Sequence, residues 1–214
     1  MYIPKHFAVE DVGWAHRLIQ DYSFGTLVTV LDGSPFATHL PFVLDPEPEP
    51  NGTLLAHMAR ANPQWRGFSA VSDAPEVLAI FQGPHAYVSP SWYEGDAPAV
   101  PTWNYAVVHA YGTPRIVDDE RQIRDFLRRL TTRQEARFER PWSPEILSEE
   151  YLSHMTHQIV AFEIPIARLE AKAKLSQNRP PVDRVRVANE LEKDPDAGSR
   201  AVSALMKDKI VPVA

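Results

Sequence analysis

A predicted hairpin near the start of the chain constrains the fold more than any other feature. Residues 24–31 form a β-branched, apolar run, and Asp32-Gly33 follows as a dipeptide typical of tight hairpin turns. Residues 35–44 then read as the returning strand. Strands joined by so short a turn pair in the antiparallel direction. The chain therefore begins an antiparallel sheet.

Four further segments have the composition of strands, and they bring the expected total to six. The chain holds 20 prolines against nine glycines, which favours many strand ends and edges over long helices. We find no alternation of strands with crossover helices and no glycine-rich phosphate fingerprint, so we do not expect a dinucleotide-binding parallel sheet. The four additional strands are expected at residues 53–58, 76–88, 102–117 and 158–169.

Helical periodicity appears before, between and after these strands. The clearest helix follows the capping pair Asp118-Asp119 and places Ile123, Phe126 and Leu130 on one face. Other helices are expected at 9–22, from 143 to about 153, and as two short helices after 181. Six strands joined mostly by hairpins, with helices around them, predict an antiparallel α+β barrel.

Composition excludes several classes of function. The chain has no cysteine, so disulfides, thiolate metal sites and cysteine nucleophiles are excluded. We see no apolar stretch of membrane-spanning length and no signal-peptide pattern, so we expect a cytoplasmic protein that does not bind a membrane. The net charge of −6 argues against a nucleic-acid binder that uses its whole surface.

One short stretch carries the strongest indication of a binding site. His57, Arg60, Asn62 and Trp65 fall within nine residues, directly after a predicted strand. Arginine offers a planar fork of donors that suits phosphate, and tryptophan offers a large flat face with one donor. This combination suits an anionic, aromatic ligand, and flavin mononucleotide (FMN) fits that description.

Four other segments concentrate aromatic and neutral hydrogen-bonding residues in the same way. These are residues 39–42, 81–93, 100–105 and 174–179. Together with the start of the chain, Met1-Tyr2-Ile3-Pro4, the motifs resemble those of the PaiB-type FMN-binding negative transcriptional regulators. This family is a branch of the split β-barrel flavoproteins, which also include pyridoxamine phosphate oxidases. The resemblance covers nearly the whole chain.

The resemblance implies an antiparallel split β-barrel with flanking helices that binds FMN as a homodimer, with the flavin sites at the subunit interface. Residues 1–180 would form the FMN-binding barrel domain and residues 181–214 a helical extension packed on it. Carried over residue by residue, His57, Arg60, Asn62 and Trp65 would lie beside the phosphate and ribityl chain. The remaining implied contacts are Gln82 at the ring or ribityl, Trp103 and Asn104 lining the pocket, and Lys174, Ser176 and Gln177 reaching in from the other subunit. The family has glycine where Ala56 stands here.

Several alternatives remain open. The resemblance implies a negative transcriptional regulator, whereas the shared barrel is equally compatible with a flavin-dependent oxidoreductase of an unknown small substrate. Seven arginines in residues 121–140 suggest either a solvated helix face or a surface that binds DNA, and a partner protein could replace DNA. Histidines in four of the strands raise the possibility of a metal, but we expect none because no metal-binding spacing occurs. Trp65, Trp92 and Trp103 could instead be core residues.

Overall fold

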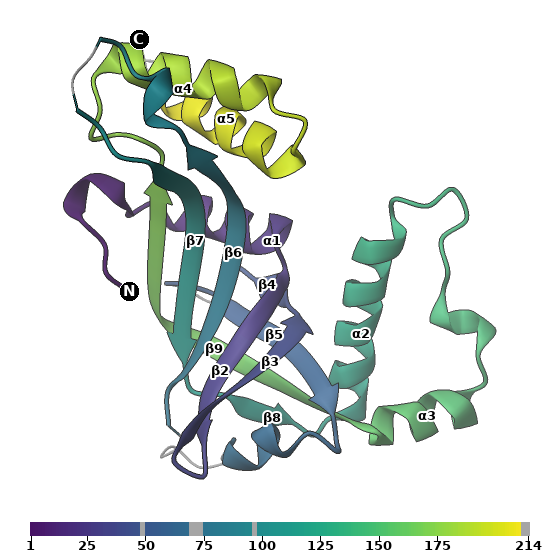
Figure 1. Cartoon of the computed structure of the whole chain (residues 1–214). Helices are drawn as coiled ribbons and strands as arrows, with labels where there is room; N and C mark the ends of the chain where they lie inside the picture. Colours follow the sequence, from purple (N-terminus) through teal and green to yellow (C-terminus); the bar gives the residue numbers. More distant parts are fainter. Residues whose placement is uncertain (48–49, 69–74, 96–97, 211–214) are drawn as a thin grey trace. The chain divides into compact units, whose positions relative to one another are not determined.

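The computed structural model describes residues 1–47, 50–68, 75–95 and 98–210 (Figure 1). These residues divide into two compact units. Unit 1 contains residues 1–15, 82–108 and 170–214, and unit 2 contains residues 16–81 and 109–169. The division into a barrel domain of residues 1–180 and a helical extension of residues 181–214 stays a prediction.

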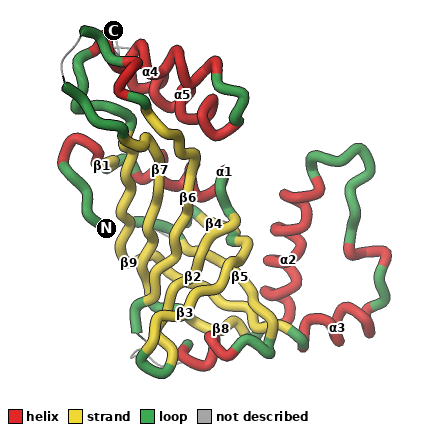
Figure 2. Tube along the Cα trace, in the orientation of Figure 1, coloured by secondary structure: helices red, strands yellow, loops and turns green. Residues whose placement is uncertain are grey.

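The strands form one antiparallel sheet with the order β3-β2-β6-β7-β9-β5-β4, and β1 and β8 pair with β9 in addition. Figure 2 draws these strands in yellow. Their bounds are β1 Ala8–Val9, β2 Phe24–Leu31, β3 Ser34–Pro41, β4 Val43–Asp45, β5 Thr53–Ala59, β6 Val77–Val88, β7 Thr102–Gly112, β8 Arg115–Val117 and β9 Ile159–Lys174.

The predicted hairpin is confirmed. β2 and β3 pair from Phe24↔Pro41 to Leu31↔Ser34, and the two residues between them, Asp32 and Gly33, have φ values of 51° and 78°. Two successive residues with positive φ give the turn that matches the twist of paired strands. The returning strand is shorter than predicted, because Phe42 separates β3 from β4 and β4 pairs with β5 instead.

Two other strands differ from prediction. The expected strand 102–117 is divided into β7 and β8 at Thr113-Pro114, since proline cannot donate a hydrogen bond to a ladder. The expected strand 158–169 continues to Lys174 as β9, because its last residues pair with β1 at Ala8↔Lys172 and Val9↔Ala171. A two-residue strand such as β1 is too short for periodicity to reveal.

The core of unit 2 lies on the inward faces of its strands. Leu27, Leu54 and Phe81 are fully buried there, and the rings of Phe42 and Phe81 meet edge to face with centroids 5.3 Å apart. Gly25 is required beside this cluster, because a Cβ atom at that position would lie 2.9 Å from the Phe81 ring. Close packing of this kind leaves little room inside the strands for a ligand.

Helix α2 (Glu120–Glu135) packs its apolar stripe on unit 2, as predicted, with Ile123, Phe126 and Leu130 buried. Its arginines are largely committed to ion pairs: Arg124 with Glu120 and Glu149, Arg128 with Asp125, and Arg129 with Asp45. The predicted second helix begins later than expected, as a short turn η4 (Pro144–Ile146) followed by α3 (Glu149–His157). Three of the seven arginines in residues 121–140 are therefore ion-paired on this helix.

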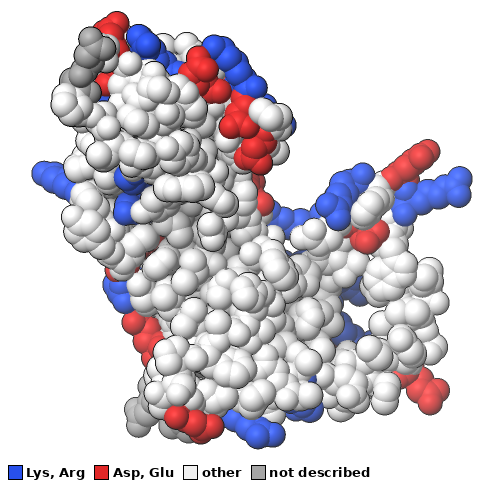
Figure 3. Space-filling view, viewed as in Figure 1, with Lys and Arg blue, Asp and Glu red and all other residues white. Residues whose placement is uncertain are grey.

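Unit 1 is closed on one side by helices. α4 (Pro181–Lys193) and α5 (Ala197–Ile210) bury Val187, Leu191 and Met206 against Ala173 and Val88 of the strands. Charged side chains gather over α4 and α5 in Figure 3. The other helical segments of the chain are η1 (Lys5–Phe7), α1 (Val12–Asp21), η2 (Pro63–Gly67) and η3 (Pro90–Trp92).

Candidate functional site

The predicted site residues fall into two groups, one in each unit. His57, Arg60, Asn62 and Trp65 belong to unit 2, whereas Gln82, Trp103, Asn104, Lys174, Ser176 and Gln177 belong to unit 1. Each group is brought together in space, and the two differ in what their polar atoms contact.

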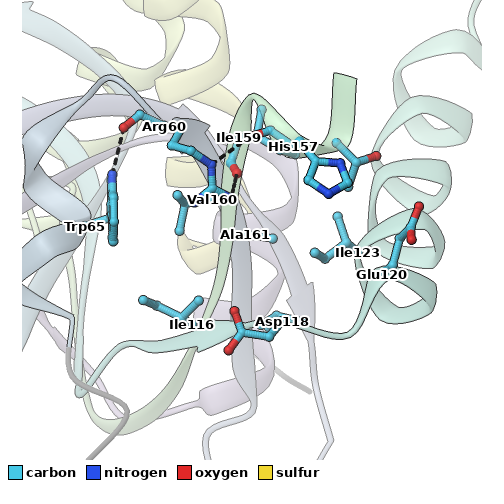
Figure 4. Close-up of a pocket in the computed structure, with 12 residues that line it drawn as sticks. Arg60, Trp65, Ile116, Asp118, Glu120, Ile123, His157, Ile159, Val160 and Ala161 are labelled. Atoms are coloured by element: carbon cyan, nitrogen blue, oxygen red, sulfur yellow. Dashed lines mark hydrogen bonds between the residues drawn. The ribbon is translucent and has the colours of Figure 1, made fainter. Parts of the chain in front are cut away.

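In unit 2, Arg60 holds the end of β5 to the start of β9. Its Nε donates to the carbonyl of His157 at 2.7 Å, and its Nη2 donates to the carbonyl of Ile159 at 2.8 Å. The Trp65 indole donates in turn to the carbonyl of Arg60 at 2.9 Å, as Figure 4 shows. Two of the five N–H donors of this guanidinium are therefore used within the chain.

Asn62 forms the N-cap of η2. Its Oδ1 accepts from the backbone nitrogen of Gln64 at 3.0 Å, and its Nδ2 donates to Thr38 Oγ1 at 3.0 Å. Gln64 itself is only 1% exposed and donates to Thr29 Oγ1 and the carbonyl of Leu27. Gln64 is not among the predicted site residues, although an asparagine followed by proline signals the capped turn that buries it.

His57 lies on the outward side of β5 against α2. Its ring meets that of Phe126 edge to face with centroids 5.8 Å apart, and its buried Nδ1 has no hydrogen-bond partner among the described residues. Burial lowers the pKa of His57 below its usual 6.5, because a charged imidazolium would lose its hydration.

A cavity of about 260 Å³ opens beside Arg60 and Trp65 (Figure 4). Its lining mixes apolar side chains such as Ile116 and Ile123 with polar ones, and it includes the carboxylates of Asp118 and Glu120. Two carboxylates disfavour a phosphate group because they repel its negative charge. The donors and charges of this cavity therefore fit a dianionic phosphate poorly.

In unit 1, an aromatic surface lies on the outward sides of β6 and β7. The side chains of Trp103 and Tyr87 are 53% and 47% exposed, and their ring centroids are 5.9 Å apart. His85 lies next to Trp103 at 6.1 Å and contacts Gln82 through a long 3.5 Å interaction. Large aromatic side chains held half-exposed are suited to stack on a planar ligand.

Lys174, at the end of β9, places a positive charge beside this surface. Its Nζ donates to Thr102 Oγ1 at 2.6 Å and to the carbonyl of Trp103. Both acceptors are neutral, and no carboxylate among the described residues forms an ion pair with this ammonium. Burial, and then the neighbouring charge of Lys172, lower the pKa of Lys174.

Asn104, Ser176 and Gln177 hold this end of β9 in place. Asn104 is fully buried, and its amide exchanges hydrogen bonds with the Ser176 hydroxyl at 2.9 Å and 3.2 Å. Ser176 has a φ of 62°, a left-handed conformation that costs energy for a residue with a Cβ atom. The Gln177 amide bonds to the backbone of Leu175 and Ala173. These three side chains position the segment that carries Lys174.

The two groups differ in how well their charges and exposed side chains suit FMN. The unit 1 face offers exposed rings and an uncompensated cation, which match an anionic flavin. The polar atoms of the unit 2 group are mainly bonded within the chain. No group of three or more potential metal-ligating histidine or acidic side chains is placed to hold a metal ion among the described residues.

Comparison with solved structures defines the class of fold. The chain superposes on the FAD- and heme-binding protein from Mycobacterium smegmatis with a TM-score of 0.56, at 16% identity, over 78% of this chain and 73% of that one. The fold is therefore an antiparallel split β-barrel with flanking helices, as predicted.

The family follows from sequence comparison. Residues 1–168 match the family described as "Putative FMN-binding domain", and the chain belongs to this family, with FMN as its cofactor. The chain is 37% identical over 210 residues to "Protease synthase and sporulation protein PAI 2" of Bacillus subtilis (strain 168), covering 98% of both chains. It is 30% identical over 244 residues to an uncharacterized protein of Emericella nidulans, covering 98% of this chain and 97% of that one.

The family assignment confirms the predicted resemblance and the predicted cofactor. Among the described residues, none of the helices is long and apolar enough to cross a membrane.

Proposed function

We propose that FMN binds on the aromatic face of unit 1, with its flat ring against Trp103 and Tyr87 and an anionic group at Lys174. The observation that carries this proposal is the combination of exposed rings with a lysine that no described carboxylate neutralises. The side chains of Asn104, Ser176 and Gln177 hold the backbone at the end of β9, which carries Lys174. Gln82 lies at the border of the aromatic surface. When bound, FMN supplies redox chemistry that the side chains cannot.

The unit 2 group has a different part in this proposal. These residues, His57, Arg60, Asn62 and Trp65, lie at the end of β5 and in the turn after it, and Arg60 bonds this segment to the start of β9. Any contact that they make with the ribityl chain or phosphate is secondary. Their exposed polar atoms remain able to accept such a contact, since the arginine fork has donors beyond the two bonds described.

We also propose that the working form is a homodimer. Large apolar side chains remain exposed along the segment that connects α2 and α3 and on α3 itself. They are Phe138 at 50%, Trp142 at 44%, Ile146 at 72%, Tyr151 at 50% and Met155 at 45% exposure. A concentration of exposed apolar residues marks an interaction surface, and a second copy of the chain would cover it.

The biological role we propose is regulatory: a flavin-dependent protein that represses gene expression in response to the state of its cofactor. This role draws on the relative from Bacillus subtilis, whose name is that of a sporulation protein. The ion pairs of α2 argue for control through a partner protein or metabolite over direct contact of that helix with DNA.

One experiment tests cofactor, site and assembly together. Purified chain is mixed with FMN and passed over a sizing column with absorbance and light-scattering detection. We expect a flavin band near 450 nm that elutes with a dimer and is lost in a Trp103→Ala, Lys174→Met double variant. An unchanged flavin content in that variant would refute the placement on unit 1, and a monomer would refute the assembly. Salt-sensitive retardation of DNA would instead support direct DNA binding.

A further inference from the structure

Lys172 is a buried lysine with few partners. Only 6% of its surface is exposed, and its Nζ donates to the carbonyl of Tyr2 at 3.3 Å. The rings of Tyr105, Tyr2 and Phe7 surround the ammonium, with centroids 5.1, 5.8 and 6.0 Å from Nζ. A buried charge without a counter-ion is costly, so its presence calls for an explanation.

Lys172 and Lys174 lie on the same side of β9, because residues two apart in a strand share a face. Both ammonium groups lie about 6 Å from the same ring, that of Phe7, at 6.0 and 5.9 Å. Glu170, two residues earlier, is engaged with the amino group of Met1 at 2.5 Å. No carboxylate in the described part of the chain forms an ion pair with either lysine. Two like charges are thus held side by side.

We propose that Lys172 and Lys174 together form an oxyanion site on the aromatic face of unit 1. Lys174, which is partly exposed, contacts the anion, and Lys172 is a fixed charge behind it. The electron-rich faces of the aromatic rings attract the ammonium group of Lys172. Water screens a buried charge less than an exposed one, so Lys172 adds positive potential at the ligand without touching it.

This inference rests on the proposed function, because it places the anion on the surface that we assign to FMN. The oxyanion has two sources with the same chemistry. It is either the phosphate monoester of FMN, or a carboxylate or phosphate carried by a second molecule that meets the flavin there.

The test uses full-length protein, a Lys172→Met variant and a Lys193→Met control. Methionine keeps the length of lysine and removes its charge. Lys193 lies at the end of α4 and pairs with Glu190, so its replacement makes the same change in net charge at another place. FMN and riboflavin, which differ only in the phosphate, are titrated separately by quenching of flavin fluorescence. The rise in melting temperature caused by inorganic phosphate, relative to chloride at equal ionic strength, is measured without flavin.

We expect wild type and Lys193→Met to prefer FMN over riboflavin. In Lys172→Met, FMN affinity should fall by roughly tenfold, as expected for the loss of one poorly screened charge near an anion, while riboflavin affinity stays unchanged. Its melting temperature without ligand should equal or exceed that of wild type, because a repelled buried charge has been removed. A purely structural lysine would give a lower melting temperature and an equal loss for both flavins.

The source of the oxyanion follows from the same data. If inorganic phosphate competes with FMN but not with riboflavin, the anion is the phosphate of FMN. If the two flavins bind alike, yet phosphate stabilises wild type more than Lys172→Met, the anion belongs to a second molecule. Both results support the oxyanion site. An unchanged flavin preference together with equal stabilisation by phosphate would overturn it.

Two further results keep the inference separate from the proposed function. A wild type that takes up neither flavin would defeat the proposed function, while the phosphate-dependent melting temperature would still test the lysine pair. Should Lys172→Met fail to fold, the wild type alone decides, because absence of stabilisation by phosphate over chloride would refute the site.

Discussion

The end of β5 in unit 2 and the aromatic face of unit 1 both combine aromatic rings with a cation, yet their surroundings differ. The cavity beside Arg60 is also lined by two acids, Asp118 and Glu120. Lys174 has a second lysine as its neighbour and contacts only neutral oxygens. Two clusters of similar composition therefore differ in electrostatic potential, and the potential decides which of them attracts an anion.

The largest effect that separates the two regions is expected from Lys174→Met. Loss of a charged hydrogen bond should weaken FMN binding by about 1.5–3 kcal/mol and leave riboflavin almost unaffected. Flavin fluorescence titrations measure both, with Lys174→Arg as the variant that keeps the charge. Equal loss of both flavins in Lys174→Met would mean that this lysine supports the fold and does not contact the phosphate.

A second test concerns the buried, hydrogen-bonded pair of Asn104 and Ser176, which positions the segment that carries Lys174. Ser176→Ala removes the hydroxyl partner of the Asn104 amide, which should lower the free energy of unfolding by about 1–3 kcal/mol. Ser176→Gly loses the same hydrogen bond but relieves the left-handed φ of 62°, and should recover about 1 kcal/mol of that loss. Urea denaturation measures both. Identical stabilities would show that the backbone at Ser176 is not strained.

Arg60→Ala provides the counterpart in unit 2. The carbonyls of His157 and Ile159 lose their charged donor, and because these bonds are at the surface we expect a loss of about 1 kcal/mol in stability. FMN affinity should change far less than in Lys174→Met. A loss of FMN affinity as large as that of Lys174→Met would contradict this difference between the two regions. It would show that the phosphate of FMN binds at the end of β5.

The smallest effect concerns pH. The lowered pKa of His57 means that the folded chain binds this proton less readily than the unfolded chain, whose value is near 6.5. Its contribution to stability is therefore complete above pH 6.5 and is lost as the pH falls below that value. Wild type should lose more stability than His57→Gln between pH 7.5 and 5.5 in urea denaturation. Parallel losses would show that His57 titrates normally.

Much of the fold was predictable because local patterns determine it. The Asp32-Gly33 turn, the stripe of Ile123, Phe126 and Leu130, and the strands around them follow from the sequence alone. The extension of β9 to Lys174 was not, because it depends on pairing with β1, which lies more than 160 residues earlier at Ala8. Long-range pairing leaves no periodic signal.

The candidate site shows the same limit. Sequence composition identified Arg60 within a polar and aromatic cluster, and the family resemblance implied that Lys174 contacts the flavin from the other subunit. It could not show that Arg60 bonds to two carbonyls, that Asn104 and Ser176 are buried and bonded to each other, or that Lys172 lies behind Lys174. Those facts depend on which atoms meet across strands, and residue type alone does not reveal them.

The pairing of Ala8 with Lys172 also affects when the binding face can assemble. Phe7, next to β1, remains without its lysine neighbours until the ribosome has synthesised nearly the whole chain. Contacts between residues so distant in sequence are slow to form, since a long loop must close first. The face that we assign to FMN is thus among the last parts to form during synthesis. If FMN binds on this face as we propose, its uptake follows translation, and truncated chains that lack β9 will not acquire flavin there.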